Sequence, residues 1–404
     1  MTTESAAVIG GVDTHAETHH AALITTTGQH VADREFFTTP AGYAAMVAFL
    51  TGHGQLVRVG VEGTSSYGAG LLTVLRAAGI EVVEVIRPTR TQRRRGKSDP
   101  IDAYNAAAVT LAGQHLPVPK QPGGDVDAIR ALLITRRSAV SARADTTRQI
   151  KTMLVTAPVE VRQRFRRLSD KQLIATLVAL RPGPATTSTP NAVLVALRTL
   201  ARRNQWLGEE IDTLESDLDI LVSRANPALR GAPGIGPVTA AQLLVTAGDN
   251  PERIASQAAF AALTGTAPIP ASSGKTTRWR LNRGGDRKAN CAIHQIVLSR
   301  LSFDPATKAY VARRQAEKKT TKEIMRCLKR AVAREIFAYL TRPQPVPGID
   351  DLRPMRQAKD ISLEKAAEQF NACAMTLSRL ERGLKRDDRF AKQYRDWLTH
   401  QPTA

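Results

Sequence analysis

The chain has 404 residues, 42% of them hydrophobic, which exceeds one ordinary domain and allows several cores. No apolar run of roughly eighteen residues and no basic-flanked leader is present, so we expect a multidomain cytoplasmic protein with no membrane segment. The three cysteines match no zinc spacing, which argues against disulfides and cysteine-bound metal. A formal net charge of +20 favours binding to a polyanion over a role in solubility alone.

Residues 7–115 alternate strand and helix patterns. The expected strands cover 7–12, 20–25, 30–38, 56–61 and 81–86, and the expected helices cover 40–50, 67–78 and a segment from about 100. Three adjacent strands followed by α-β-α-β-α is the element order of an α/β RNase H-like domain, in which the first and fourth strands are parallel neighbours. That topology predicts that Asp13 and Glu62, at the ends of those strands, lie side by side.

Two further carboxylates, Asp99 and Asp102, begin the next helix. They are three residues apart with Pro100 in the first turn, so both can lie on one face of the helix. Four converging carboxylates would repel one another unless a cation such as Mg²⁺ (or Mn²⁺) lies between them. Singly, each could instead be a helix-capping or strand-end polar residue. The element order favours the metal site.

Basic and histidine residues surround these carboxylates. The loop before Asp99 is a solvated loop or a guide for a phosphate backbone, and its candidate contacts are Arg93, Arg94, Arg95 and Lys97. The three histidines of the first turn and second strand do not lie on a helix, so we interpret them as solvated or substrate-facing: His15, His19 and His20.

The middle of the chain is helical. Long amphipathic helices are expected over 125–157 and 192–225, with a loop at 181–190, and neither helix can bury its apolar stripe alone. We therefore expect a coiled-coil arm or pairing between subunits. The following Pro233-Gly234-Ile235-Gly236 indicates either the hairpin of a helix-hairpin-helix module, with backbone N–H groups facing a phosphate, or a plain glycine turn.

A second stretch of candidate catalytic residues contains Ser272, Ser273 and Gly274. A hydroxyl beside glycine is open to approach, although Ser-Ser-Gly is also a common loop composition. The cations that follow could hold a scissile phosphate and stabilise its developing charge: Lys275, Arg278, Arg280, Arg283 and Arg287. A helix from about 289 and the basic region 318–334 offer further phosphate contacts.

Residues 343–350 form a proline-rich linker, and residues 351–404 resemble a Cro-type helix-turn-helix. Ser362 is the expected N-cap of its first motif helix, and Glu381-Arg382-Gly383 closes the second. The side chains expected to face a DNA groove are Met375, Thr376 and Arg379. The alternative is a small helical dimerisation domain.

In order, the motifs at Asp13, Glu62, Asp99-Pro100-Ile101-Asp102, Pro233–Gly236 and Ser273 resemble those of the DEDD transposases of bacterial insertion sequences. These are bridge-RNA-guided serine recombinases, and the resemblance covers about residues 7–342. It implies a RuvC-like catalytic domain at 1–120, a helical coiled-coil linker at 121–226 and a transposase domain at 227–342. The helix-turn-helix lies outside the usual pattern.

The resemblance implies that Ser273 attacks a DNA phosphate to form a covalent phosphoserine, and that the metal-bound tetrad assists by polarising the phosphate. It also implies a structured guide RNA that pairs with donor and target DNA, and a dimer or tetramer with shared active sites. Ser272 is a local ambiguity, since spacing from Pro268 favours Ser273. The rival hypotheses are a metal-dependent endonuclease or junction resolvase without serine covalency, and a non-enzymatic DNA-binding regulator.

Overall fold

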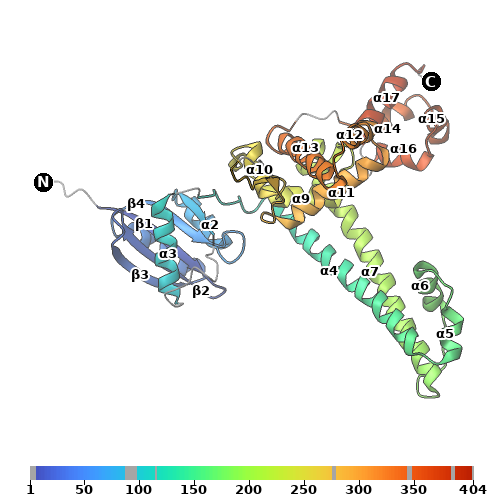
Figure 1. Cartoon of the computed structure of the whole chain (residues 1–404), viewed down its shortest axis with the longest axis horizontal. Helices are drawn as coiled ribbons and strands as arrows, with labels where there is room; N and C mark the ends of the chain where they lie inside the picture. The colour runs from blue at the N-terminus through green and yellow to red at the C-terminus, as the bar shows by residue number, and fades with distance from the viewer. Residues whose placement is uncertain are drawn as a thin grey trace. The chain divides into compact units, whose positions relative to one another are not determined.

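The computed structural model describes residues 6–86, 98–113, 116–274, 279–343, 348–383 and 387–402 (Figure 1). The chain divides into two compact units. The N-terminal unit comprises Met1–Gly124 with Ala247–Arg253, and the second unit comprises Asp125–Thr246 with Ile254–Ala404. Every helix in the described part of the chain is too short or too polar to cross a membrane.

The N-terminal unit is a mixed sheet covered by helices, as predicted. Its strand order is β3-β2-β1-β4-β5, and β1 pairs antiparallel with β2 but parallel with β4. The strands are β1 (Ala7–Thr14), β2 (Thr18–Thr25), β3 (His30–Phe37), β4 (Gln55–Glu62) and β5 (Val82–Val85). The predicted central position of the first and fourth strands is thus confirmed, and the architecture is consistent with an RNase H-like domain.

Helices cover both faces of this sheet. On one face, α1 (Pro40–Thr51) and α2 (Ala69–Ala77) bury Met46 and Leu72 against strand residues such as Val59. On the other, α3 (Asp99–Ala112) packs Ala107 against Ile9 and Ile24 (Figure 1). Burial of both faces explains why the central strands are nearly continuous apolar runs rather than alternating ones.

The second unit begins with the predicted arm. Here α4 (Asp125–Thr156) packs along α7 (Thr189–Ala225), which confirms that the two apolar stripes pair within one chain (Figure 1). Between them lie α5 (Val159–Phe165) and α6 (Asp170–Ala179), where no element was predicted. These short helices bury the end of the arm, because Phe165 and Leu177 pack with Ile150 and Leu197.

The following segment of the second unit consists mainly of helices. Two short strands pair antiparallel, Ile269 opposite Arg280 and Pro270 opposite Trp279, and the predicted helix from 289 begins at Arg287 after the N-cap Asp286. The elements are α8 (Pro227–Gly231), α9 (Pro237–Ala247), the 3₁₀ turn η2 (Pro251–Arg253, in the N-terminal unit), α10 (Gln257–Leu263), β6 (Ile269–Pro270), β7 (Trp279–Arg280), α11 (Arg287–Phe303), α12 (Pro305–Ala316) and α13 (Thr321–Thr341).

The C-terminal residues form a small helical bundle with its own core. Its helices are α14 (Leu352–Gln357), α15 (Leu363–Gln369), α16 (Ala374–Glu381) and α17 (Asp388–Thr399). Leu352, Leu377 and Tyr394 are fully buried in this core. Ser362 is the N-cap of α15, as predicted, since its side chain accepts a hydrogen bond from the Lys365 backbone N–H at 3.2 Å. Its assignment as a Cro-type helix-turn-helix stays a prediction.

Candidate functional site

Parallel pairing of β1 and β4 brings two of the predicted carboxylates to one edge of the sheet. Val12 lies opposite Val61 in the register, so Asp13 and Glu62 follow at the same level, and both are buried. The Thr14 hydroxyl donates a 3.0 Å hydrogen bond to the Glu62 carbonyl oxygen, which fastens the two strand ends together. The side-by-side placement expected from the topology is therefore observed.

Helix α3 brings the other two carboxylates to this edge. It begins at Asp99 with Pro100 in its first turn, and Asp102 lies three residues on, buried at 6% exposure. The helix lies unusually close to β1, because a Cβ on Gly11 would come within 2.1 Å of the Ala107 nitrogen and 2.4 Å of the Ala103 oxygen. Glycine at position 11 thus permits the approach that holds Asp99 near Asp13.

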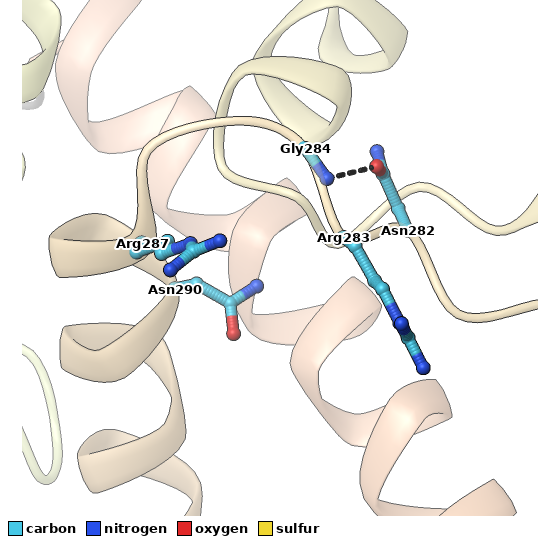
Figure 2. A pocket seen from close by; sticks show the side chains of 5 residues that line it. All are labelled: Asn282, Arg283, Gly284, Arg287 and Asn290. Atoms are coloured by element: carbon cyan, nitrogen blue, oxygen red, sulfur yellow. Dashed lines mark hydrogen bonds between the residues drawn. The ribbon is translucent and has the colours of Figure 1, made fainter.

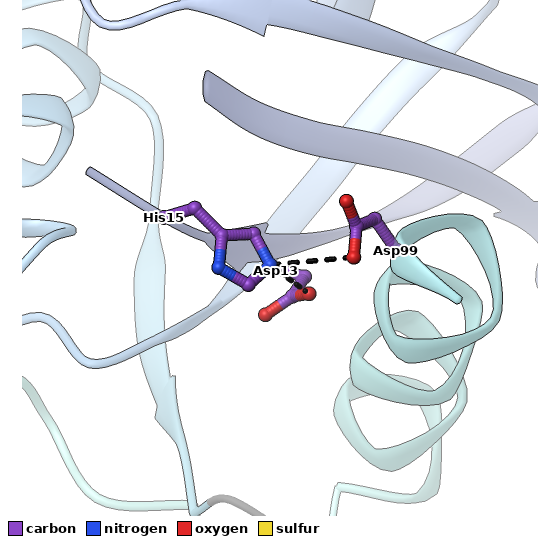
Figure 3. Close-up of side chains that lie close together, drawn as sticks. All are labelled: Asp13, His15 and Asp99. Atoms are coloured by element: carbon purple, nitrogen blue, oxygen red, sulfur yellow. Dashed lines mark hydrogen bonds and ion pairs between the residues drawn. The ribbon is translucent and has the colours of Figure 1, made fainter. Parts of the chain in front are cut away.

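His15 completes a compact group with two of these carboxylates (Figure 3). Its Nε2 lies 3.1 Å from Asp13 Oδ2 and 3.4 Å from Asp99 Oδ1. Donor atoms of the three side chains all lie within 4.8 Å of one another, the dimension of a metal-binding cluster. Among the described residues, Glu62 and Asp102 do not belong to this group, although the charge of Asp102 acts on Asp13. The sequence analysis did not assign His15 to this group. The feature that could have indicated it is the position two residues after Asp13, since alternate side chains of an extended chain share a face.

The electrostatics of Asp13 fit a bound cation. Burial chiefly raises the pKa of Asp13, His15 lowers it, and the charges of Asp102 and Asp99 raise it further. Asp13 Oδ1 is buried and has no hydrogen-bond partner among the described residues. An unpaired carboxylate oxygen in this setting is costly unless a cation satisfies it, and oxygen donors are those that Mg²⁺ and Mn²⁺ prefer. The residues therefore fit a divalent ion.

The other two histidines are not solvated, contrary to the sequence interpretation. His19 is fully buried, stacks on Tyr43 of α1 with ring centroids 5.8 Å apart, and has a pKa lowered chiefly by burial. His20 Nε2 lies 2.7 Å from Asp33 Oδ2. Neither histidine belongs to the group of Asp13, His15 and Asp99 within the described residues, since His19 packs on Tyr43 and His20 pairs with Asp33.

Ser273 lies in the loop between β6 and β7 of the second unit and is exposed, as is Ser272. The neighbouring Gly274 has φ of +54°, a conformation that favours glycine. Several predicted phosphate contacts fall outside the described residues: Arg93, Arg94, Arg95, Lys97, Lys275 and Arg278. The others, Arg280, Arg283 and Arg287, are described and exposed.

Arg283 and Arg287 line one pocket of about 250 Å³ with Asn282 and Asn290 (Figure 2). The Asn282 side chain accepts a 2.8 Å hydrogen bond from the Gly284 backbone N–H, which shapes the loop that carries Arg283. Two guanidinium groups beside amide side chains form a suitable environment for a phosphate. Arg283 and Arg287 are close in sequence, and the loop that leads into the N-cap of α11 places both beside the same pocket.

The predicted groove-facing residues lie on α16. Met375 is 54% exposed, Arg379 is exposed and Thr376 is partly exposed, whereas Leu377 and Leu380 point into the core. The Pro-Gly-Ile-Gly turn precedes α9, and the Arg300 guanidinium donates a 2.8 Å hydrogen bond to the Pro233 carbonyl oxygen. This contact fixes the turn against α11.

Comparison with known proteins shows that segments of both units are similar to transposases. Residues 10–157 match a DEDD transposase family of IS110 elements, and residues 226–312 match the transposase family IS116/IS110/IS902. The chain is 25% identical over 387 residues to an insertion element IS110 protein of Streptomyces coelicolor, covering 84% of this chain and 95% of that protein. It is 23% identical over 329 residues to a protein of the same organism named "Mini-circle putative transposase for IS117", covering 68% of this chain and 80% of that protein. Both units of the chain are thus similar to transposases of IS110-related insertion elements.

Proposed function

We propose that this protein is an insertion-sequence transposase that cuts and rejoins DNA through a covalent phosphoserine at Ser273, aided by a metal-bound carboxylate tetrad. The observation that carries the proposal is the buried Oδ1 of Asp13, which has no partner among the residues that the structure describes and lies beside Asp99 and His15, within a range that matches a DEDD transposase family. The exposed position of Ser273 in the loop between two short strands, the second of which carries the exposed Arg280, supports its role as nucleophile.

In the proposed step, Ser273 Oγ attacks phosphorus, and an O–P bond forms as the bond to the leaving deoxyribose oxygen breaks. The serine proton passes to a base, and the leaving oxygen becomes a hydroxyl by gaining a proton. Because the phosphoserine keeps a phosphodiester bond, a hydroxyl from another DNA end can reverse the reaction and join new strands. Arg280 and Arg283 would neutralise charge on the phosphate.

Asp13, Glu62, Asp99 and Asp102 are the proposed metal-holding residues. A divalent ion bound there would polarise a phosphate oxygen. In this chain, the close packing of α3 on Gly11 fixes the spacing of the carboxylates, and His15 orients Asp13 and Asp99 through its Nε2. His15 thus adds a residue to the proposed site that the tetrad does not include.

The guide RNA and the dimer or tetramer belong to the proposal on the basis of the resemblance, and the net charge of +20 supports a large nucleic-acid partner. The C-terminal bundle is proposed to bind DNA directly through Met375, Thr376 and Arg379. Deletion of residues 348–404 tests this role, because these residues form a bundle with its own core. Binding to the element's own DNA should weaken; unchanged binding would contradict direct contact.

The decisive functional test compares Ser273→Ala with its neighbour Ser272→Ala in a recombination assay on DNA that carries the element's ends. We expect Ser273→Ala to abolish recombination and Ser272→Ala to retain it. A metal-dependent endonuclease without serine covalency would keep cutting DNA in both variants. A non-enzymatic regulator would show DNA binding without cutting in the unmodified protein.

A further inference from the structure

The second unit contains a large basic cleft beside the strands that flank the Ser273 loop. Its volume is about 830 Å³, within the range of pockets that enclose sizeable ligands. One wall comes from residues 265–268 and 279–282, and the other from α12 and α13. The cleft is therefore formed by segments that are distant in sequence and meet only in the folded unit.

Helix α13 presents a row of like charges to this cleft. Arg326, Arg330 and Arg334 are spaced four residues apart, so they lie on one face of the helix, and all three line the cleft. Arg326 and Arg334 are exposed and make no hydrogen bond or close ion pair with any residue that the structure describes. Burial, followed by the charge of Arg334, lowers the pKa of Arg330. Among the described residues, the row therefore keeps a net positive charge.

The one carboxylate among the lining residues, Glu323, offsets only part of this charge, because it acts on Arg326 and Lys319 while the other cations of the cleft outnumber it. Glu323 is committed to a capping box, in which its side chain accepts hydrogen bonds from the Thr320 backbone N–H at 2.9 Å and hydroxyl at 2.8 Å. On the opposite wall, Arg280 adds another exposed cation. A polyanion that entered the cleft would find cations on both sides.

Trp279 adds a flat apolar surface to this positive cleft. Its side chain is 59% exposed, although it lies on β7 directly beside Arg280. An indole ring among cations is the combination that binds single-stranded nucleic acid, because a base can stack on the ring while the phosphates contact the cations. In a duplex the base faces are already covered by their neighbours, so the indole requires an unstacked base.

We propose that this cleft binds an unpaired nucleotide segment, with a base stacked on Trp279 and the adjoining phosphates held by Arg280 and the α13 arginines. The inference rests on the proposed function, since β6 and β7 flank the loop that carries Ser273. The segment is a strand opened next to the scissile phosphate or an unpaired stretch of RNA, because both present the same base and phosphate chemistry.

The test measures binding of the full-length protein to labelled oligothymidine, oligouridine and duplex DNA by fluorescence anisotropy. Trp279→Ala should weaken binding of a single strand by about 5- to 150-fold, the loss expected for one base stack, and change duplex binding by less than about twofold. Trp279→Phe should retain part of the affinity. Trp206→Ala is the matched control, since Trp206 on the arm is also 59% exposed.

The two oligonucleotides separate the sources of the strand: a larger loss for oligothymidine identifies DNA, and a larger loss for oligouridine identifies RNA. Equal losses for duplex and single strands, or no loss at all, would overturn the proposal. A shift in subunit number by Trp279→Ala with unchanged oligonucleotide affinity would also overturn it, because Trp279 would then be a protein contact. The binding assay needs no recombination, so it can fail while Ser273 proves to be the nucleophile, and the reverse also holds.

Discussion

At the scale of single residues, Asp13 combines burial, negative charge and an oxygen without a partner among the described residues. Removing an ion from water costs several kcal/mol unless the protein compensates, and the raised pKa of Asp13 reflects this cost together with the nearby charges of Asp102 and Asp99. His15 offsets part of this cost, because its Nε2 lies 3.1 Å from Asp13 Oδ2. A divalent cation would satisfy the rest, so metal should stabilise the folded N-terminal unit.

The first prediction concerns Asp13→Asn. We expect Mg²⁺ or Mn²⁺ to raise the Tm of the unmodified protein, with about 2.7 kcal/mol of added stability at a metal concentration one hundred times Kd. The variant should lose this response, yet be at least as stable in chelator because the buried charge is gone. Thermal unfolding with and without metal measures both effects. Glu35→Gln, at an exposed carboxylate on β3, should respond like the unmodified protein; a full response of Asp13→Asn would contradict a metal site at this residue.

The approach of Asp99 to Asp13 could be predicted from sequence because each stands at the start or end of an element, and element order places those ends together. The role of all four carboxylates as a tetrad stays a prediction. His15 was missed because it lies just beyond β1, in a turn, where a histidine is usually solvated. His15 becomes part of the cluster only because Asp99 approaches it from α3. Trp279 was missed for a similar reason, since its cleft needs α13 as the second wall.

At the scale of elements, the distance between α3 and β1 controls the carboxylate cluster. The second prediction is that Gly11→Ala destabilises the protein by about 1–3 kcal/mol and removes the metal-induced rise in Tm, because its Cβ would collide with backbone atoms of α3. Thermal unfolding measures both. Gly10→Ala is the control, because its Cβ would meet the Val59 side chain at 3.0 Å rather than backbone. An equal effect of both variants would contradict the proposed role of close packing.

The C-terminal bundle depends on a buried ion pair between α14 and α16. Arg356 Nε and Nη2 donate to the Glu381 carboxylate at 2.7 and 2.9 Å, and the Tyr394 hydroxyl donates to it at 2.8 Å. Burial, followed by this hydrogen bond to Glu381, raises the pKa of Tyr394. The network ties the start of the bundle to the end of the helix proposed to contact DNA.

The third prediction is that Glu381→Ala destabilises the bundle by about 3–5 kcal/mol, because it leaves the Arg356 charge buried without its partner. Hydrogen exchange of residues 349–398 should increase while exchange of the N-terminal sheet stays unchanged. Asp351→Asn breaks the more exposed pair with Arg395 and should cost less than about 1 kcal/mol. Similar losses for the two variants would show that burial of the pair is unimportant.

Sequence patterns predicted the long or strongly patterned elements, including the five strands and the paired helices of the arm, because their periodicity reports burial directly. They failed to predict α5 and α6, which are short and become stable by covering Ile150 and Leu197 of the arm. The two-residue strands β6 and β7 carry no periodicity at all. Such elements depend on tertiary contacts that no local window contains.

At the scale of the whole molecule, the carboxylate cluster and Ser273 belong to different compact units, and both units match transposase families. The excess of cations implies that much of the binding energy comes from phosphate contacts, which weaken as salt increases. Affinity for nucleic acid should therefore fall steeply with salt, and each cation that contacts a phosphate should contribute to the slope.

The fourth prediction concerns the exposed cations of α13. Changing Arg326 and Arg334 together to Gln should reduce the slope of log affinity against log salt by about 1.4 for single-stranded oligonucleotides, with little dependence on sequence. Anisotropy titrations at several salt concentrations provide the slope. The control changes two exposed arginines on the arm, Arg202 and Arg203, to Gln and should leave it unchanged. An unchanged slope for the α13 variant would show that its arginines do not contact phosphates.

The most direct test of the central claim is capture of the covalent intermediate. The unmodified protein is incubated with Mg²⁺ and nicked DNA that carries the element's ends, so that the released fragment diffuses away and rejoining is blocked. We predict a protein–DNA adduct that survives denaturation and that, after digestion, places the phosphate on Ser273 by mass spectrometry. Ser272→Ala should form the adduct and Ser273→Ala should not. DNA cleavage without any adduct, or an adduct that persists in Ser273→Ala, would contradict the account.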